Sequence, residues 1–124
     1  MAQFARPVSP DIDTSNWSST EASLWQATNE TVADDARIIQ AADADVFEYD
    51  CELSLGATIA DPLQSGGHSL RVRAQKSDSF NRNLLVDLRQ GGSTLASWTI
   101  TTLTTAFVDF DLTLSEGQAD SLVP

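Results

Sequence analysis

Apolar and polar residues alternate over several short segments of this chain, and such alternation is typical of half-buried β-strands. Residues 46–55 show it most clearly, because aromatic, thiol and aliphatic side chains occupy every second position and acidic or hydroxyl side chains lie between them. Successive side chains of a strand point to opposite faces, so this segment predicts a strand with one dry face and one wet face. The dry face would hold Phe47, Tyr49, Cys51, Leu53 and Leu55.

The same period of two recurs in four later segments, residues 68–75, 84–89, 96–100 and 108–114. Each segment predicts a strand with an inward apolar set. The predicted inward residues are Leu70, Val72 and Ala74, then Leu84, Val86 and Leu88, then Ala96, Trp98 and Ile100, and finally Val108, Phe110, Leu112 and Leu114.

Turn formers and capping residues mark the connections between these segments. Gln90-Gly91-Gly92-Ser93 predicts a tight hairpin between two strands. Residues 115–120 predict one helical turn with Ser115 as its N-cap. The polar interval 28–36 allows another helical turn, capped by Thr28 or Asn29, and residues 37–40 predict a short strand after it.

Together these elements predict an all-β protein. Regularly spaced strands with long early loops and one tight hairpin favour a jelly-roll-like antiparallel β-sandwich over an up-and-down barrel. Residues 1–16 contain Pro7, Pro10 and several turn formers, and proline removes a ladder donor. The prediction is an extended N-terminal arm over residues 1–16 and a β-sandwich domain over residues 17–124.

Composition narrows the classes of partner. At 124 residues the chain is expected to form one domain. Its 18 acidic and 7 basic residues give a formal net charge of −11. Such a chain is repelled by phosphate backbones and anionic lipid, so we expect neither nucleic-acid nor membrane binding. The N-terminus has no basic region before an apolar core, which argues against a signal peptide and for synthesis and solubility in the cytoplasm.

Candidate chemistry is sparse. Asp34, Asp35, Asp43 and Asp45 could supply oxygen ligands to calcium, but the EF-hand spacing is absent and a solvated surface is favoured. His68 is the single histidine, and no G-x-S-x-G segment accompanies it. We therefore expect no catalytic residues, no metal, no cofactor and no enzymatic activity. Cys51, the single cysteine, is expected to pack as a small hydrophobe.

Opposite charges suggest one strand pairing. Glu48, Asp50 and Glu52 form an acidic outward stripe, whereas Arg71 and Arg73 form a basic pair on a later strand. Opposite charges stabilise neighbouring strands when they face each other across a ladder. The pattern predicts that these two strands are neighbours in one sheet.

The order of segments resembles small virion proteins of tailed phages and prophages. The likeness runs through most of the chain and is a pattern of strands and turns. It is carried by Phe4-Ala5-Arg6-Pro7, Trp17, Leu24-Trp25, Glu30 and Asp34-Asp35, and further on by His68-Ser69-Leu70-Arg71-Val72-Arg73, Leu88-Arg89-Gln90-Gly91, Leu112-Thr113-Leu114-Ser115 and Ala119-Asp120.

The resemblance implies a structural protein on the surface of a phage capsid, and most directly a capsid decoration (cement) protein. It implies the major capsid protein as partner, a virion location after synthesis in the host cytoplasm, and a homotrimer matching the three-fold vertices of such shells. The arm would reach neighbouring proteins. The expected partner-binding residues are Phe4, Arg6, Pro7, Trp17 and Trp25.

Two other functions fit the same expected fold. A carbohydrate-binding jelly-roll module of a tail fibre or host-recognition spike would present exposed aromatic rings for stacking against sugars. A tail or neck structural protein would use the sandwich only as a building block. A fold of this class hosts all three functions, so it does not choose among them.

Overall fold

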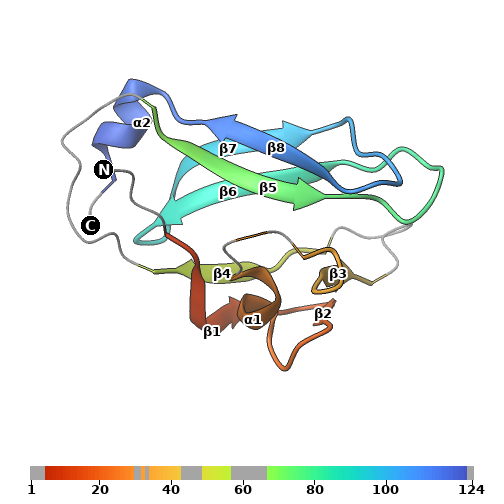
Figure 1. Ribbon diagram of the computed structural model, residues 1–124. Coiled ribbons are helices and arrows are strands. Elements are labelled where there is room, and N and C mark those ends of the chain that lie inside the picture. Colours follow the sequence, from red (N-terminus) through yellow and green to blue (C-terminus); the bar gives the residue numbers. More distant parts are fainter. Residues whose placement is uncertain (1–4, 30–31, 33, 43–48, 57–66, 123–124) are drawn as a thin grey trace. The chain divides into compact units, whose positions relative to one another are not determined.

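A computed structural model of the chain describes residues 5–29, 32, 34–42, 49–56 and 67–122. These residues form eight strands and two short helices, and all their strand pairs are antiparallel, so the predicted all-β class is confirmed. The chain divides into two compact units, residues 1–60 (unit 1) and residues 61–124 (unit 2). In Figure 1, unit 1 runs from red to yellow and unit 2 from green to blue.

Unit 1 is built from two short antiparallel ribbons and a helix. Strand β1 (Pro7–Asp13) pairs with β4 (Glu52–Leu55), and β2 (Trp17–Ser19) pairs with β3 (Ile39–Ala41). Helix α1 (Leu24–Thr28) buries Leu24 and Ala27. The β1 segment was expected to belong to an extended arm, and its backbone is paired within unit 1.

Unit 2 consists of two longer ribbons that are nested in the sequence. Strand β5 (Ser69–Ala74) pairs with β8 (Val108–Thr113), and between them β6 (Leu84–Gln90) pairs with β7 (Ser93–Ile100). Helix α2 (Glu116–Asp120) follows β8 (Figure 1). None of the helices in the described parts of the chain is long and apolar enough to cross a membrane.

The predicted alternation holds along the strands of unit 2. The inward residues of β5, β6 and β7 are buried or half-buried, and the residues between them are more exposed. On β8, Phe110 and Leu112 are half-buried as expected. Val108 was predicted to face inward, and this was wrong, because its side chain is 40% exposed. Val108 forms the last pair of the ladder, with Ala74, at the end of the ribbon.

Both local signals in unit 2 are confirmed. Gly91 and Gly92 form the two-residue turn between β6 and β7 with φ values of 59° and 82°. This left-handed backbone costs a glycine little because it has no Cβ. Ser115 caps α2 through a capping box. Its hydroxyl accepts from the Gln118 backbone N–H at 3.2 Å, and the Gln118 side chain accepts from the Ser115 N–H at 2.8 Å.

Two predictions for unit 1 need correction. Within the described part of the strand predicted over residues 46–55, residues 49–51 are not strand and β4 begins at Glu52, since β1 ends at Asp13 opposite Glu52. Residues 43–48, which include Phe47 and Glu48, lie outside the described residues. The helical turn expected to begin at Thr28 or Asn29 instead ends there, because α1 spans Leu24–Thr28.

The strand pairing inferred from charge was wrong. Arg71 and Arg73 face Asp111 and Asp109 on β8, not the acidic stripe of residues 48–52. Arg71 forms a bidentate pair, with Nε–Oδ1 and Nη2–Oδ2 distances of 2.7 and 3.0 Å. The sequence contains two acidic stripes with the same alternation, so opposite charge alone does not identify the neighbouring strand.

Candidate functional site

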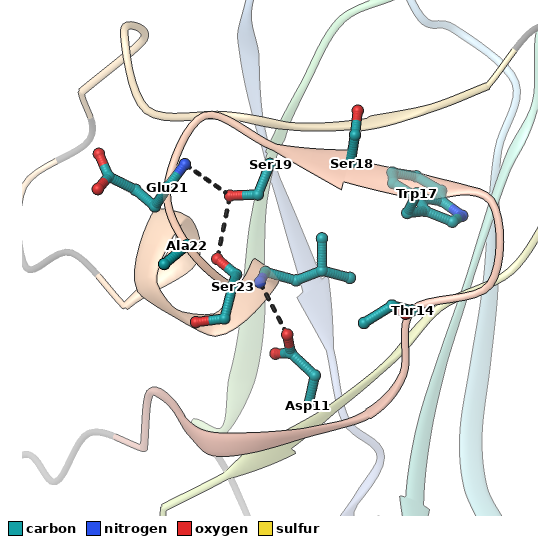
Figure 2. A pocket seen from close by; sticks show the side chains of 9 residues that line it. Asp11, Thr14, Trp17, Ser18, Ser19, Glu21, Ala22 and Ser23 are labelled. Atoms are coloured by element: carbon teal, nitrogen blue, oxygen red, sulfur yellow. Dashed lines mark hydrogen bonds between the residues drawn. The ribbon is translucent and has the colours of Figure 1, made fainter.

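An open pocket in unit 1 is the candidate binding site. It has a volume of about 240 Å³ and lies where the turn after β1 and strand β2 meet the segment that leads into α1. Figure 2 shows hydroxyl and carboxylate side chains around it and the Trp17 ring at one side. The lining residues are Asp11, Thr14, Trp17, Ser18, Ser19, Glu21, Ala22, Ser23 and Leu24.

Asp11 joins β1 to α1. Its two carboxylate oxygens accept hydrogen bonds from the backbone N–H groups of Leu24 and Trp25, both at 2.8 Å. The first N–H groups of a helix have no partner inside the helix, and a carboxylate is favourable beside them. Ser23 occupies the N-cap position but its hydroxyl donates to Gln26 Oε1 at 2.9 Å. Asp11 therefore takes the capping role, and its oxygens are already used in the structure.

The hydroxyl groups of the pocket also bond to their own loop. Ser19 Oγ accepts from the Glu21 backbone N–H at 2.9 Å and donates to the Ser23 carbonyl at 3.0 Å (Figure 2). Glu21 lies 3.6 Å from Arg37 Nε in an exposed ion pair. These hydrogen bonds hold the shape of the loop around the pocket.

Trp17 is the one aromatic residue that lines the pocket. It begins β2, and its backbone N–H donates to the Thr14 carbonyl at 2.8 Å. Its indole Nε1 is enclosed by protein and has no hydrogen-bond partner among the described residues. An enclosed donor is not offered to a ligand in the open pocket, so Trp17 contributes to this site through its ring surface.

Of the expected partner-binding residues that the structure describes, Trp17 lines this pocket, whereas Arg6, Pro7 and Trp25 do not. Arg6 directly precedes β1, Pro7 begins it, and Trp25 is in α1. Arg6 Nη1 donates to the Asn29 carbonyl at 3.4 Å, so β1 is held to α1 at both ends of the helix. Phe4 lies outside the described residues.

Three exposed aliphatic side chains on the β1–β4 ribbon were missed by the sequence reasoning. Val8 and Ile12 belong to β1, and Leu55 ends β4. Ile12 is 58% exposed, and Leu55, predicted to face inward, is 42% exposed. Leu55 forms the last pair of the described ladder, with Pro7. We call Val8, Ile12 and Leu55 the aliphatic set of the β1–β4 ribbon.

Cys51 is poorly suited to thiol chemistry. Burial raises its pKa to about 11, and the nearby carboxylates of Asp11, Asp50 and Asp13 add to the shift. A thiol with such a pKa remains protonated near neutral pH, and the thiolate is the reactive form. The environment is that of a packing residue.

The described residues offer no metal centre. No group of three or more His, Cys, Asp or Glu side chains among them is arranged to hold a metal ion. Asp34 Oδ1 accepts from the Ala36 N–H at 2.9 Å, and its carbonyl accepts from the Arg37 N–H at 3.0 Å. These contacts make Asp34 part of a turn. Asp43 and Asp45 lie outside the described residues.

Comparisons with known proteins do not assign the chain to a family. No protein-family model, curated protein sequence or solved structure matches the chain significantly.

Proposed function

We propose that the protein is a structural component of a tailed-phage particle, a capsid decoration protein that binds the outer head surface and stabilises it. The observation that carries the proposal is the aliphatic set of the β1–β4 ribbon. Val8 and Ile12 lie in the N-terminal segment that the sequence resemblance assigns to partner contact, and Leu55 lies on the strand paired with it. Covering exposed apolar side chains removes them from water, which favours binding. A chain with a net charge of −11 needs such apolar contact to hold a partner.

The proposed architecture is a jelly roll. In a jelly roll, a long hairpin folds over so that nested strand pairs alternate between two sheets. The β5–β8 pair enclosing the β6–β7 pair is consistent with the inner part of that arrangement. A rigid sandwich of this kind suits a protein that reinforces a shell.

The proposed partners are the major capsid protein and further copies of this chain. A homotrimer fits the three-fold positions of a phage shell, because a symmetric oligomer matches the symmetry of the lattice that it covers. The proposed location is therefore the capsid surface of the virion. No enzymatic step, cofactor or metal is part of this function.

Carbohydrate binding is the second candidate, and the pocket beside Trp17 favours it. An indole surface beside several hydroxyl groups is a common setting for sugar recognition. A glycan array probed with the purified protein tests this function. Selective binding to one glycan that the free sugar competes away would favour a function in host recognition over capsid decoration.

Capsid binding can be tested by changing one exposed aliphatic residue at a time. The purified protein is added to capsids that lack it, and occupancy is measured by co-sedimentation. We expect Ile12→Ser to lower the affinity by about tenfold or more, as loss of an interface anchor does. Leu85→Ser is the matched control, because Leu85 on β6 is 60% exposed and lies in unit 2. If Ile12→Ser occupies capsids as fully as the wild-type chain does, the β1–β4 ribbon is not the surface that contacts the capsid.

Phe4 needs a separate variant. Deleting residues 2–16 would remove all of β1 together with the Asp11 cap, so loss of binding would then report a damaged unit 1. Deletion of residues 2–5 keeps Arg6 and β1 in the chain. We expect this shorter deletion to leave the unfolding temperature unchanged and to weaken capsid binding. Full occupancy would exclude the first five residues as an anchor.

A further inference from the structure

Two connections meet at one end of the ribbons of unit 2. The connection from β5 to β6 comprises residues 75–83, and the connection from β7 to β8 comprises residues 101–107 (Figure 1). The Lys76 backbone N–H donates to the Thr104 carbonyl at 2.8 Å, and this hydrogen bond joins the two connections. We call the surface formed by these two connections the neutral loop end of unit 2.

The exposed residues of the neutral loop end carry no charge. Apart from Phe80 and Ala106, every exposed residue of the two connections is a serine, threonine, asparagine or glutamine. The charged residues of the connections are Lys76, Asp78 and Arg82, and all three are only half-buried to solvent. The chain as a whole carries a net charge of −11, so an uncharged surface of this extent is unusual for it.

The charged side chains bond to one another and to the backbone around Phe80. Lys76 Nζ donates to the Phe80 carbonyl at 2.7 Å, and Asp78 Oδ1 accepts from the Phe80 N–H at 3.1 Å. Arg82 Nη2 donates to Asp78 Oδ2 at 2.6 Å. These contacts order the loop, and a loop ordered before binding loses little conformational entropy when a ligand binds.

The Phe80 ring is offered to solvent by this loop. Its side chain is 65% exposed although it is large and apolar. The Arg82 guanidinium lies over the ring, 5.7 Å from its centre. A cation over one face of a ring is favourable, and the exposure of Phe80 leaves ring surface open to a ligand.

The composition of this surface favours a neutral sugar over a protein or a charged ligand. A sugar has apolar C–H faces that stack on an aromatic ring, and it has hydroxyl groups that exchange hydrogen bonds with hydroxyl and amide side chains. Protein interfaces gather several apolar groups at their core, whereas Phe80 is the one exposed large apolar residue of these two connections. The bordering charges of Arg73 and Asp109 are paired with each other at 3.1 Å.

We propose that the neutral loop end of unit 2 is a binding surface for a neutral glycan, with Phe80 as the ring on which the sugar stacks. This surface shares no residue with the pocket beside Trp17 in unit 1. Glycan binding at Phe80 goes beyond capsid decoration and does not depend on it. A capsid-bound chain with this surface would attach the particle to a glycan-bearing surface.

The test uses the purified full chain and neutral oligosaccharides of glucose, galactose, mannose and N-acetylglucosamine, screened on an array and then titrated in solution. We expect the wild-type chain to bind at least one of them equally well at about 50 mM and about 500 mM salt, because uncharged contacts are not screened. Phe80→Ala should raise the dissociation constant by about tenfold or more. Ile12→Ala is the matched control and should leave it unchanged, because Ile12 is 58% exposed and lies in unit 1.

Phe80→Trp separates stacking from a structural role of the side chain. It keeps an aromatic ring at this position, so binding should be at least as tight as in the wild-type chain. Circular dichroism melting confirms that each variant is folded.

Three results would overturn the proposal: no binding to any of these oligosaccharides, binding that Phe80→Ala leaves unchanged, or loss of capsid occupancy in Phe80→Ala without glycan binding. The last result would show that the ring contacts protein. Capsid occupancy in Ile12→Ser is read separately, so failure of one proposal does not decide the other.

Discussion

Unit 1 and unit 2 obtain their order in different ways. Unit 2 has strands of six to eight residues with long ladders, and the alternation of apolar residues along them places the core. Unit 1 has ribbons of three or four ladder pairs, and it adds contacts from side chains to distant backbone groups, above all from Asp11 to α1. Short ribbons are marginal alone. The comparison teaches that unit 1 depends on individual polar contacts where unit 2 depends on burial.

The largest expected effect tests burial in unit 2. Ile100 on β7 is 5% exposed, so Ile100→Ala should lower the free energy of unfolding by about 2–4 kcal/mol through lost burial and a residual cavity. Leu85→Ala on the neighbouring strand removes an exposed side chain and should change the free energy of unfolding by less than about 0.5 kcal/mol. Urea titration measures both. Equal losses for the two variants would show that burial does not decide the stability of unit 2.

The next effect tests the polar contact in unit 1. Asp11→Ala leaves the N–H groups of Leu24 and Trp25 without their acceptor, and we expect a loss of about 1–2 kcal/mol. Hydrogen exchange should accelerate in α1 and β1, while amides of β6 and β7 stay protected. Asp11→Asn keeps one acceptor oxygen and should lose less. Exchange that is unchanged in α1 would show that the Asp11 contact is not what holds unit 1.

A smaller effect tests the turn that fixes the register of β6 and β7. Gly92 has a φ of 82°, so Gly92→Ala should cost about 1 kcal/mol through backbone strain. Gly117 in α2 is the matched control, because its φ is not in the left-handed region and a Cβ there meets no atom within 4 Å. Gly117→Ala should be neutral or slightly stabilising. Thermal unfolding distinguishes them, and equal behaviour would contradict the assigned turn.

Near neutral pH the smallest effect concerns the Cys51 thiol in unit 1. Its pKa is raised from 9.0 to about 11, so above pH 9 the unfolded chain loses this proton more readily than the folded chain. The contribution of Cys51 to stability is therefore complete below pH 9 and declines as the pH rises toward 11. The free energy of unfolding, measured from pH 9 to pH 11, should decline less in Cys51→Ala than in the wild-type chain. Rapid alkylation of the folded chain at pH 8 would contradict the raised pKa.

Much of unit 2 could be predicted from the sequence, because its determinants are local. Alternation placed Leu70, Val86 and Trp98 on inward faces, two glycines marked the hairpin, and Ser115 marked the start of α2. Pairing between distant strands was not local. The sequence offers Arg71 and Arg73 two sets of acidic partners, the earlier acidic stripe and the pair Asp109 and Asp111. Only the register of β5 and β8 in the structure decides between them.

The candidate site in unit 1 was harder to predict for a physical reason. Asp11 caps a helix that begins thirteen residues later, and no spacing rule connects a capping carboxylate to so distant a helix. The Ser23 hydroxyl, at the N-cap position itself, donates to Gln26 Oε1. Exposure of Leu55 and Val108 follows from where each ladder ends, and alternation carries no information on strand ends.

The most direct test of the proposed role is a reconstruction of the intact particle in which this chain is located. We expect density for the chain on the outer head surface at three-fold positions, with the β1–β4 ribbon against the shell. The chain bound at the tail, at the neck or on a fibre tip would contradict a role in capsid decoration.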